Sequence, residues 1–148
     1  SAHIREGGCR CGQLRFRIPW PPMITMACHC TGCQKMTGGP YSLSAMIAGD
    51  AFEVTKGQPV VGGLKGDEID HMFCPNCMSW VFTRVMDGAF INVRSPMLDD
   101  TSDTEPYVES YTSEKLDWVK LETPHSFEKF PELDDYTAII QAYAARQD

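Results

Sequence analysis

The sequence lacks the features of several protein classes. Basic residues are few: 13 Lys and Arg stand against 20 Asp and Glu, which gives a formal net charge of −7. Nucleic-acid affinity depends largely on neutralising phosphates, and these basic residues are scattered singly, so we expect no nucleic-acid partner. No apolar run approaches the roughly 20 residues of a membrane-spanning helix, so we expect no membrane insertion. Residues 1–8 lack the apolar stretch of a secretory signal, which favours a cytoplasmic location.

Repeats, low-complexity segments and obvious linkers are also absent from the 148 residues. This length is typical of one domain, so we expect a single domain over residues 1–148. It is long enough to bury a hydrophobic core of its own. The sequence leaves open whether the protein is a monomer or a homodimer.

Alternating apolar residues and frequent turn residues indicate a mainly β fold. Leu14, Phe16 and Ile18 alternate with arginines, which is the pattern of a half-buried strand. The sequence Asp87-Gly88 favours a hairpin turn between the last two expected strands. The further strands are expected at residues 23–27, 41–48, 52–55, 69–73, 80–85 and 89–93.

One helix is expected, over residues 133–145. Its apolar residues fall at helical spacing and share one face; they are Tyr136, Ile139, Ile140 and Tyr143. Residues 97–106 are acidic and rich in turn formers, so we expect an exposed loop there. Residues 107–118 fit neither a helical nor a strand pattern clearly.

All seven cysteines fall into three tight clusters, and none lies elsewhere. The odd count and the cysteines only one residue apart do not suit a disulfide framework, and cytosolic thiols stay reduced. The spacing instead predicts metal binding. Thiolate ligands favour zinc, with iron in a four-thiolate site as the alternative. The clusters are Cys9-x-Cys11, Cys28-x-Cys30-x-x-Cys33 and Cys74-Pro-Asn-Cys77.

Seven thiolates divide naturally into a set of four and a set of three. Four protein ligands make a closed, structural zinc site, whereas three leave an open position, which is the catalytic arrangement. Zinc with three thiolates is a poor generator of hydroxide but suits capture of a fourth thiol, whose pKa it lowers. The alternative is a second structural site completed by a histidine, either His29 or His71.

Three motifs resemble those of the glutathione-dependent formaldehyde-activating family, which shares a domain with centromere protein V. They are GGCRCGQLRF at residues 7–16, CHCTGCQK at residues 28–35 and CPNC at residues 74–77. The resemblance covers roughly residues 7–93 and implies an Mss4-like fold, a tent of antiparallel sheets pinned by zinc. It implies a structural zinc on Cys9, Cys11, Cys74 and Cys77, and a catalytic zinc on Cys28, Cys30 and Cys33.

The resemblance also implies a reaction, in which glutathione condenses with formaldehyde to S-hydroxymethylglutathione. The protein would then be a carbon–sulfur lyase acting on a small-molecule thiol and an aldehyde. Gln34 and Lys35 could bind the carboxylates of a glutathione-like substrate, or they could simply begin an exposed helix. Arg94, after a strand, is a weaker candidate for anion binding.

Two other functions are alternatives to this reaction. The first is non-enzymatic: a zinc-stabilised binding module of the Mss4-like class. The second is methionine sulfoxide reduction, which requires a free nucleophilic cysteine, and none remains once the ligands are counted. The chain also departs from the family at Met78, where members usually carry glycine after the last cysteine. Because a non-glycine residue at positive φ is uncommon, we expect a strained or differently shaped turn there.

Overall fold

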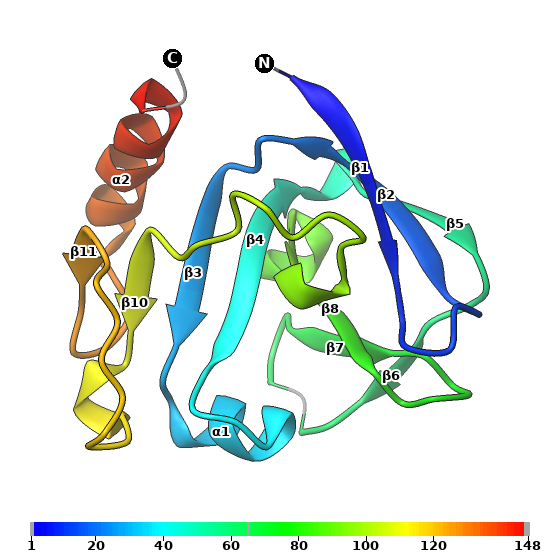
Figure 1. Ribbon diagram of the computed structural model, residues 1–148, viewed down its shortest axis with the longest axis horizontal. Coiled ribbons are helices and arrows are strands. Elements are labelled where there is room, and N and C mark those ends of the chain that lie inside the picture. The colour runs from blue at the N-terminus through cyan, green and yellow to red at the C-terminus, as the bar shows by residue number, and fades with distance from the viewer. Residues whose placement is uncertain (1, 65, 147–148) are drawn as a thin grey trace.

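Eleven strands form two sheets in the computed structural model, which describes residues 2–64 and 66–146 (Figure 1). The smaller sheet has the strand order β1-β2-β5, and the larger has the order β11-β10-β3-β4-β9-β8-β7-β6. The expected mainly β fold is confirmed. The strands are β1 His3–Gly8, β2 Arg15–Trp20, β3 Ile24–Cys28, β4 Ser42–Ala48, β5 Glu53–Lys56, β6 Val60–Gly62, β7 Asp70–Phe73, β8 Trp80–Val85, β9 Phe90–Val93, β10 Val108–Ser110 and β11 His125–Ser126.

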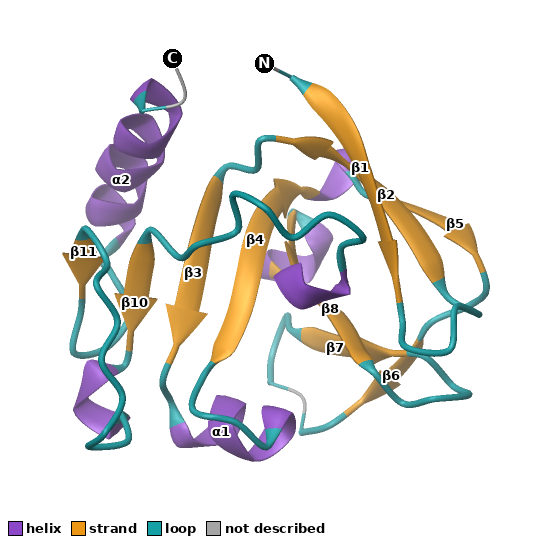
Figure 2. Cartoon of the chain, in the orientation of Figure 1, coloured by secondary structure: helices purple, strands orange, loops and turns teal. Residues whose placement is uncertain are grey.

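Two α-helices accompany the sheets, α1 at Thr31–Thr37 and α2 at Leu133–Ala145 (Figure 2). The expected C-terminal helix is confirmed with the same bounds. Ile139 and Tyr143 of α2 are buried, and Ile139 packs against Ile24 of β3 and Val108 of β10. Short 3-10 turns complete the fold: η1 Gly49–Ala51, η2 Met86–Gly88, η3 Ser95–Met97 and η4 Thr112–Glu114. None of the described helices has the length and apolar content that crossing a membrane would require.

The main hydrophobic core joins the two sheets. Phe16 and Ile18 of β2 are each 1% exposed, as the alternating pattern predicted, and they pack with residues of β8 and β9 such as Val81 and Val93. Cys9 and Cys74 belong to the same cluster of buried residues. One cysteine site therefore lies at the edge of the core, where it can hold the two sheets together.

The acidic segment 97–106 differs in part from the expected exposed loop. Its aspartates are exposed, but Leu98 is 4% exposed and pairs with Gly7 of β1. Arg5, itself buried, reaches the segment through an ion pair with Asp103 at 3.3 Å. The loop is therefore fastened to β1 by one apolar side chain and one buried arginine.

Candidate functional site

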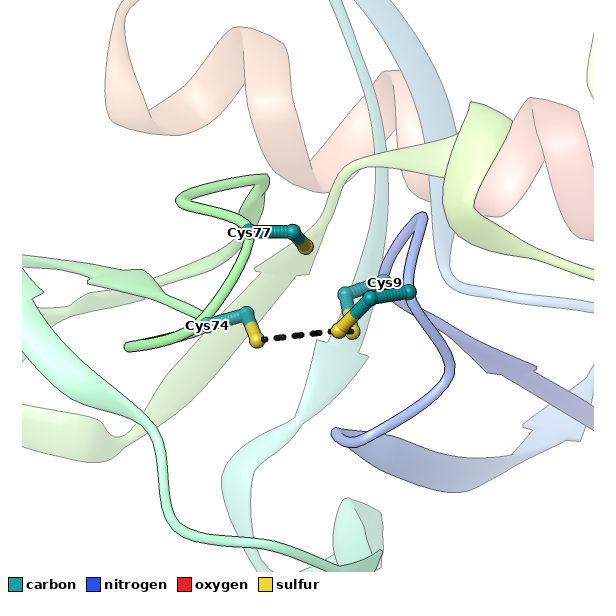
Figure 3. A group of neighbouring side chains, drawn as sticks. Cys9, Cys74 and Cys77 are labelled. Atoms are coloured by element: carbon teal, nitrogen blue, oxygen red, sulfur yellow. Dashed lines mark hydrogen bonds between the residues drawn. The ribbon is translucent and has the colours of Figure 1, made fainter.

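The four-cysteine cluster is built from two turns that are distant in sequence. Cys9 and Cys11 follow β1, while Cys74 and Cys77 follow β7, and Figure 3 shows Cys9, Cys74 and Cys77 converging from the two turns. The Sγ atoms of Cys9 and Cys11 lie 3.6 Å apart and those of Cys11 and Cys74 lie 3.7 Å apart. Tetrahedral zinc with bonds of about 2.3 Å places its sulfurs about 3.8 Å from one another. The four free thiols thus have the spacing that a zinc ion requires.

Ser79 ties the two turns of this cluster together. The backbone N–H of Arg10 donates to Ser79 Oγ at 3.2 Å, and Ser79 Oγ lies 3.2 Å from Cys77 Sγ. The hydrogen bond from the Ser79 hydroxyl to the sulfur lowers the pKa of Cys77 to about 5. This hydroxyl therefore favours the thiolate form that a metal needs.

Met78 has the strained backbone that its replacement of glycine led us to expect. Its φ is 58°, in the left-handed region. The conformation is set by two backbone hydrogen bonds that close the turn: Met78 N–H to Cys74 O at 2.9 Å, and Cys74 N–H to Ser79 O at 3.1 Å. The side chain itself is 56% exposed, so packing does not compensate for the strain.

Replacing Met78 with glycine should stabilise the protein. Relief of the left-handed strain should raise the free energy of unfolding by about 1–2 kcal/mol. The greater conformational freedom of glycine in the unfolded state should lower it by about 0.5–1 kcal/mol. A net gain of about 0.5–1 kcal/mol corresponds to a rise in Tm of about 1–4 °C, measurable by calorimetry. Met78→Ala is the matched control, because it removes the same side chain but keeps Cβ. An equal rise in Met78→Ala would contradict strain as the cause.

The three-cysteine cluster is contained in one short stretch of chain. Cys28 ends β3, Cys30 is the N-cap of α1 and Cys33 lies in its first turn. The three Sγ atoms lie within 4.8 Å of one another, and all three residues are half-buried. The Cys33 N–H donates to Cys30 Sγ at 3.3 Å, so the helix start itself fixes one sulfur. Gly38, with φ 65°, ends the helix after two turns.

The electrostatics of this cluster call for a cation. The hydrogen bond with Cys33 lowers the pKa of Cys28 to about 5, and the same bond raises the pKa of Cys33, with burial adding to that rise. Three thiolates cannot ionise side by side without a positive charge between them. Sulfur donors in this number and spacing fit zinc. Both clusters could therefore hold a metal ion, and their chemistry is consistent with zinc.

Neither histidine considered as a further ligand joins a cluster within the described part of the chain. His29 is fully buried, and its Nε2 lies 2.7 Å from Glu109 Oε1 of β10. His71 Nδ1 lies 3.0 Å from Thr83 Oγ1, and its ring packs edge-on against Trp80. Both rings are thus engaged with the surrounding protein rather than with the sulfurs.

The two predicted substrate-binding residues occupy different positions. Gln34 Nε2 donates to the backbone oxygens of His29 and Glu114, at 2.7 and 2.9 Å. Both amide donors of Gln34 are therefore in use, and they fasten α1 to the loop after β10 rather than pointing to a substrate. Lys35 is exposed in the last turn of α1, where its charge is accessible.

Sequence reasoning missed several residues that contact the three-cysteine cluster. Ser110 of β10 and Ser42 of β4 lie opposite Cys28 on the two strands that flank it; Ser110 helps to lower the pKa of Cys28, and Ser42 acts in the same direction on the pKa of Cys33. Glu109 holds His29 and in turn accepts a hydrogen bond from Ser126 Oγ at 2.6 Å. Burial raises the pKa of Glu109, but the hydrogen bonds from Ser126, His29 and Thr123 more than offset this and keep that pKa below its ordinary value. No local pattern marks these residues, because strand pairing brings them together: β10 and β4 both pair with β3, which places Ser110 and Ser42 on either side of Cys28, and β11 pairs with β10.

The fold and the two cysteine clusters define a mainly β protein with two thiol clusters that could each hold a metal ion. The chain belongs to the glutathione-dependent formaldehyde-activating enzyme family, whose model matches residues 4–114. A relative from Halomonas elongata, named "Putative glutathione-dependent formaldehyde-activating enzyme", is 32% identical over 132 residues, covering 81% of this chain and 82% of the relative. A crystal structure of a Rhodobacter sphaeroides protein has a similar fold, with a TM-score of 0.56 at 16% identity, and covers 66% of this chain and 91% of that one.

Proposed function

We propose that the protein is a zinc-dependent carbon–sulfur lyase that adds a small-molecule thiol, such as glutathione, to an aldehyde, such as formaldehyde. The three-cysteine cluster carries the proposal. It offers one sulfur fewer than the four ligands of a closed zinc site, and its residues are half-buried rather than sealed in the core. Family membership and the name of the Halomonas relative support the same reactants.

Cys28, Cys30 and Cys33 would hold the ion. When bound, zinc supplies a position for a substrate thiol and lowers the pKa of that thiol. The hydroxyls of Ser110 and Ser42 favour the thiolate forms of Cys28 and Cys33, and the Cys33 N–H orients Cys30.

The reaction joins the thiol sulfur to the carbonyl carbon. The thiol gives up its proton, the C=O π pair moves to oxygen, and that oxygen takes up one proton, so the product is a hemithioacetal, R–S–CH(OH)–R'. On the exposed face of α1, Lys35 would attract a substrate carboxylate. Gln34 keeps α1, and with it Cys33, in place against the backbone of His29 and Glu114.

The lability of the bound zinc tests this function. We expect two zinc ions per chain, one of which a mild chelator removes, and we expect glutathione to slow that removal because its sulfur occupies the open position. Zinc content by atomic emission, with and without glutathione, measures this. Catalysis is measured by NMR exchange between free and formaldehyde-bound glutathione, compared with the uncatalysed rate.

Two results would contradict the proposal. One is a single tight zinc per chain on which glutathione has no effect. The other is glutathione–formaldehyde exchange that never exceeds the uncatalysed rate. Either result would favour a zinc-stabilised binding module instead. S-methylglutathione is the matched control, because it keeps every group of glutathione except the free thiol and should give no protection.

A further inference from the structure

A buried arginine beside the pocket next to α1 has no acidic partner within residues 2–64 and 66–146. Arg94 follows β9 and is 9% exposed. Its guanidinium stacks on the indole of Trp80, 3.8 Å from the ring centre. Its Nη2 donates to Thr83 Oγ1 at 2.6 Å, which is the one side-chain hydrogen bond it makes within the described part of the chain. The Nε–H donor has no partner among those residues.

Arg5 provides an internal comparison, because it is buried to a similar degree. Arg5 is 6% exposed and forms ion pairs with Asp100 and Asp103, and it also stacks on an indole, that of Trp20. No carboxylate among the described residues forms an ion pair with Arg94. A buried charge without a counter-ion is costly, and burial indeed lowers the pKa of Arg94 to about 10. The two arginines are thus alike in burial and in stacking on an indole, but among the described residues only Arg5 has carboxylate partners.

The Arg94 side chain lines a pocket of about 290 Å³ beside α1. This volume is at the small end of ligand pockets, enough for a carboxylate and a few attached atoms. The walls carry no acidic side chain; they include Met36, Tyr41, Leu43 and Trp80. A larger cavity near β1 has no cysteine in its lining. Its arginines, Arg5 and Arg17, are already ion-paired, and it also carries the carboxylates of Glu6, Asp99 and Asp100, which disfavours a further anion there.

The pocket adjoins the three-cysteine cluster through α1. Met36 lies three residues after Cys33 on this helix and forms part of the pocket wall. Leu43, another residue of the pocket wall, directly follows Ser42 in β4, and Ser42 acts on the pKa of Cys33. The pocket and the cluster are therefore built on the same helix, α1, and on adjacent residues of β4.

We propose that this pocket is an anion subsite in which Arg94 binds a carboxylate carried by one of the two reactants. The inference rests on the proposed function and extends it, because it assigns the chain a preference for carboxylate-bearing substrates. Arginine suits the task, since its planar guanidinium matches a carboxylate and stacking on Trp80 holds it in orientation. The carboxylate can belong to the thiol or to the aldehyde, and the two sources are separable by experiment.

A different role for Arg94 is to offset the negative charge of the three thiolates. That role requires only a positive charge near the cluster. It predicts equal effects of an Arg94 substitution on reactants with and without a carboxylate, together with weaker zinc retention. Only a subsite discriminates between matched reactants.

Two matched pairs of reactants test the subsite by steady-state kinetics. N-acetylcysteine and N-acetylcysteamine differ by the carboxylate on the thiol, and glyoxylate and acetaldehyde differ by the carboxylate on the aldehyde. For one of these pairs, Arg94→Met should raise KM of the carboxylate member about tenfold or more, the effect of losing a charged hydrogen bond, while KM of the neutral member stays within about twofold. The affected pair identifies the source. Arg84→Met, which removes an exposed arginine of β8, is the matched control and should change neither.

Direct binding separates the subsite from the proposed chemistry. S-methyl-N-acetylcysteine and glyoxylate each carry a carboxylate but no free thiol, so calorimetric titration with either one reports binding without turnover. If the protein shows no turnover but binds these carboxylates in a way that depends on Arg94, the proposed function is refuted and the subsite is supported. Turnover with equal KM changes for both members of each pair would overturn the subsite and leave the proposed function standing.

The conservative variant keeps the test decisive if Arg94→Met does not fold. Arg94→Lys preserves the charge but not the planar guanidinium, and we expect it to raise KM of the carboxylate member severalfold with zinc content unchanged. If Arg94→Lys leaves the ratio of the two KM values as in the wild-type protein, the subsite is refuted and charge compensation is the role of Arg94.

Discussion

Replacing Cys74 with serine is expected to abolish the cooperative fold. Cys74 is fully buried, and its Sγ lies 3.7 Å from Cys11 Sγ across the contact between the two turns. Structural zinc binding is worth about 10–16 kcal/mol in zinc-finger peptides, which is comparable to the total stability of a domain, about 5–15 kcal/mol. Loss of one ligand should therefore leave too little free energy to hold the sheets together. Circular dichroism during thermal unfolding would show no cooperative transition.

Chelation provides an independent check of the Cys74 prediction. Stripping all zinc from the wild-type protein with a strong chelator should reproduce the unfolded state of Cys74→Ser, and adding zinc back should restore the wild-type fold but not that of the variant. A Cys74→Ser protein that melts cooperatively near the wild-type Tm would show that the four-cysteine cluster does not stabilise the fold.

Replacing Cys30 with serine should have the opposite profile: loss of thiol binding with the fold retained. Cys30 is half-buried and caps α1. Serine is itself a favourable N-cap residue, so the helix start survives while a metal ligand is lost. We expect the labile zinc to disappear from the metal analysis, and glutathione binding by calorimetry to fall below detection. The tight zinc should stay.

The comparison of the two serine variants distinguishes the two kinds of site. Cys30→Ser should unfold within a few degrees of the wild-type protein, because only a small, half-exposed cluster is affected. Equal destabilisation of Cys30→Ser and Cys74→Ser would mean that both clusters are structural, and the proposed thiol chemistry would lose its site.

Local patterns in the sequence predict the parts of this structure that depend on neighbours in the chain. The cysteine spacing identifies both clusters, and the periodicity of residues 133–145 gives α2 with its observed bounds. Helix α1 has no buried residue and spans seven residues, so it carries no apolar face to detect. Strand β1 has a single large apolar residue, Ile4, which is exposed, and the strand is held instead by pairing with β2 and by burial of Arg5.

The surroundings of the three-cysteine cluster could not be predicted because they come from distant segments. Glu109 reaches His29 across 80 residues of chain. Arg94 has the same local sequence signal as any arginine after a strand. What sets it apart is that no residue in the described part of the chain gives it an acidic partner, which is a property of the packed structure. Gln34 lies beside the cluster as expected, but its hydrogen bonds to backbone oxygens are set by the loop after β10.

The unequal sequence separation of the two cysteine clusters has a consequence for how the protein would acquire metal as it folds. Cys28 and Cys33 are neighbours in the chain, whereas Cys11 and Cys74 are 63 residues apart. Closing the longer loop costs more chain entropy, and contacts between distant residues form slowly. During synthesis, the three-cysteine cluster is complete long before Cys77 emerges, so it can capture an ion from a largely unfolded chain. The four-cysteine site can be loaded only when β7 has joined the sheet.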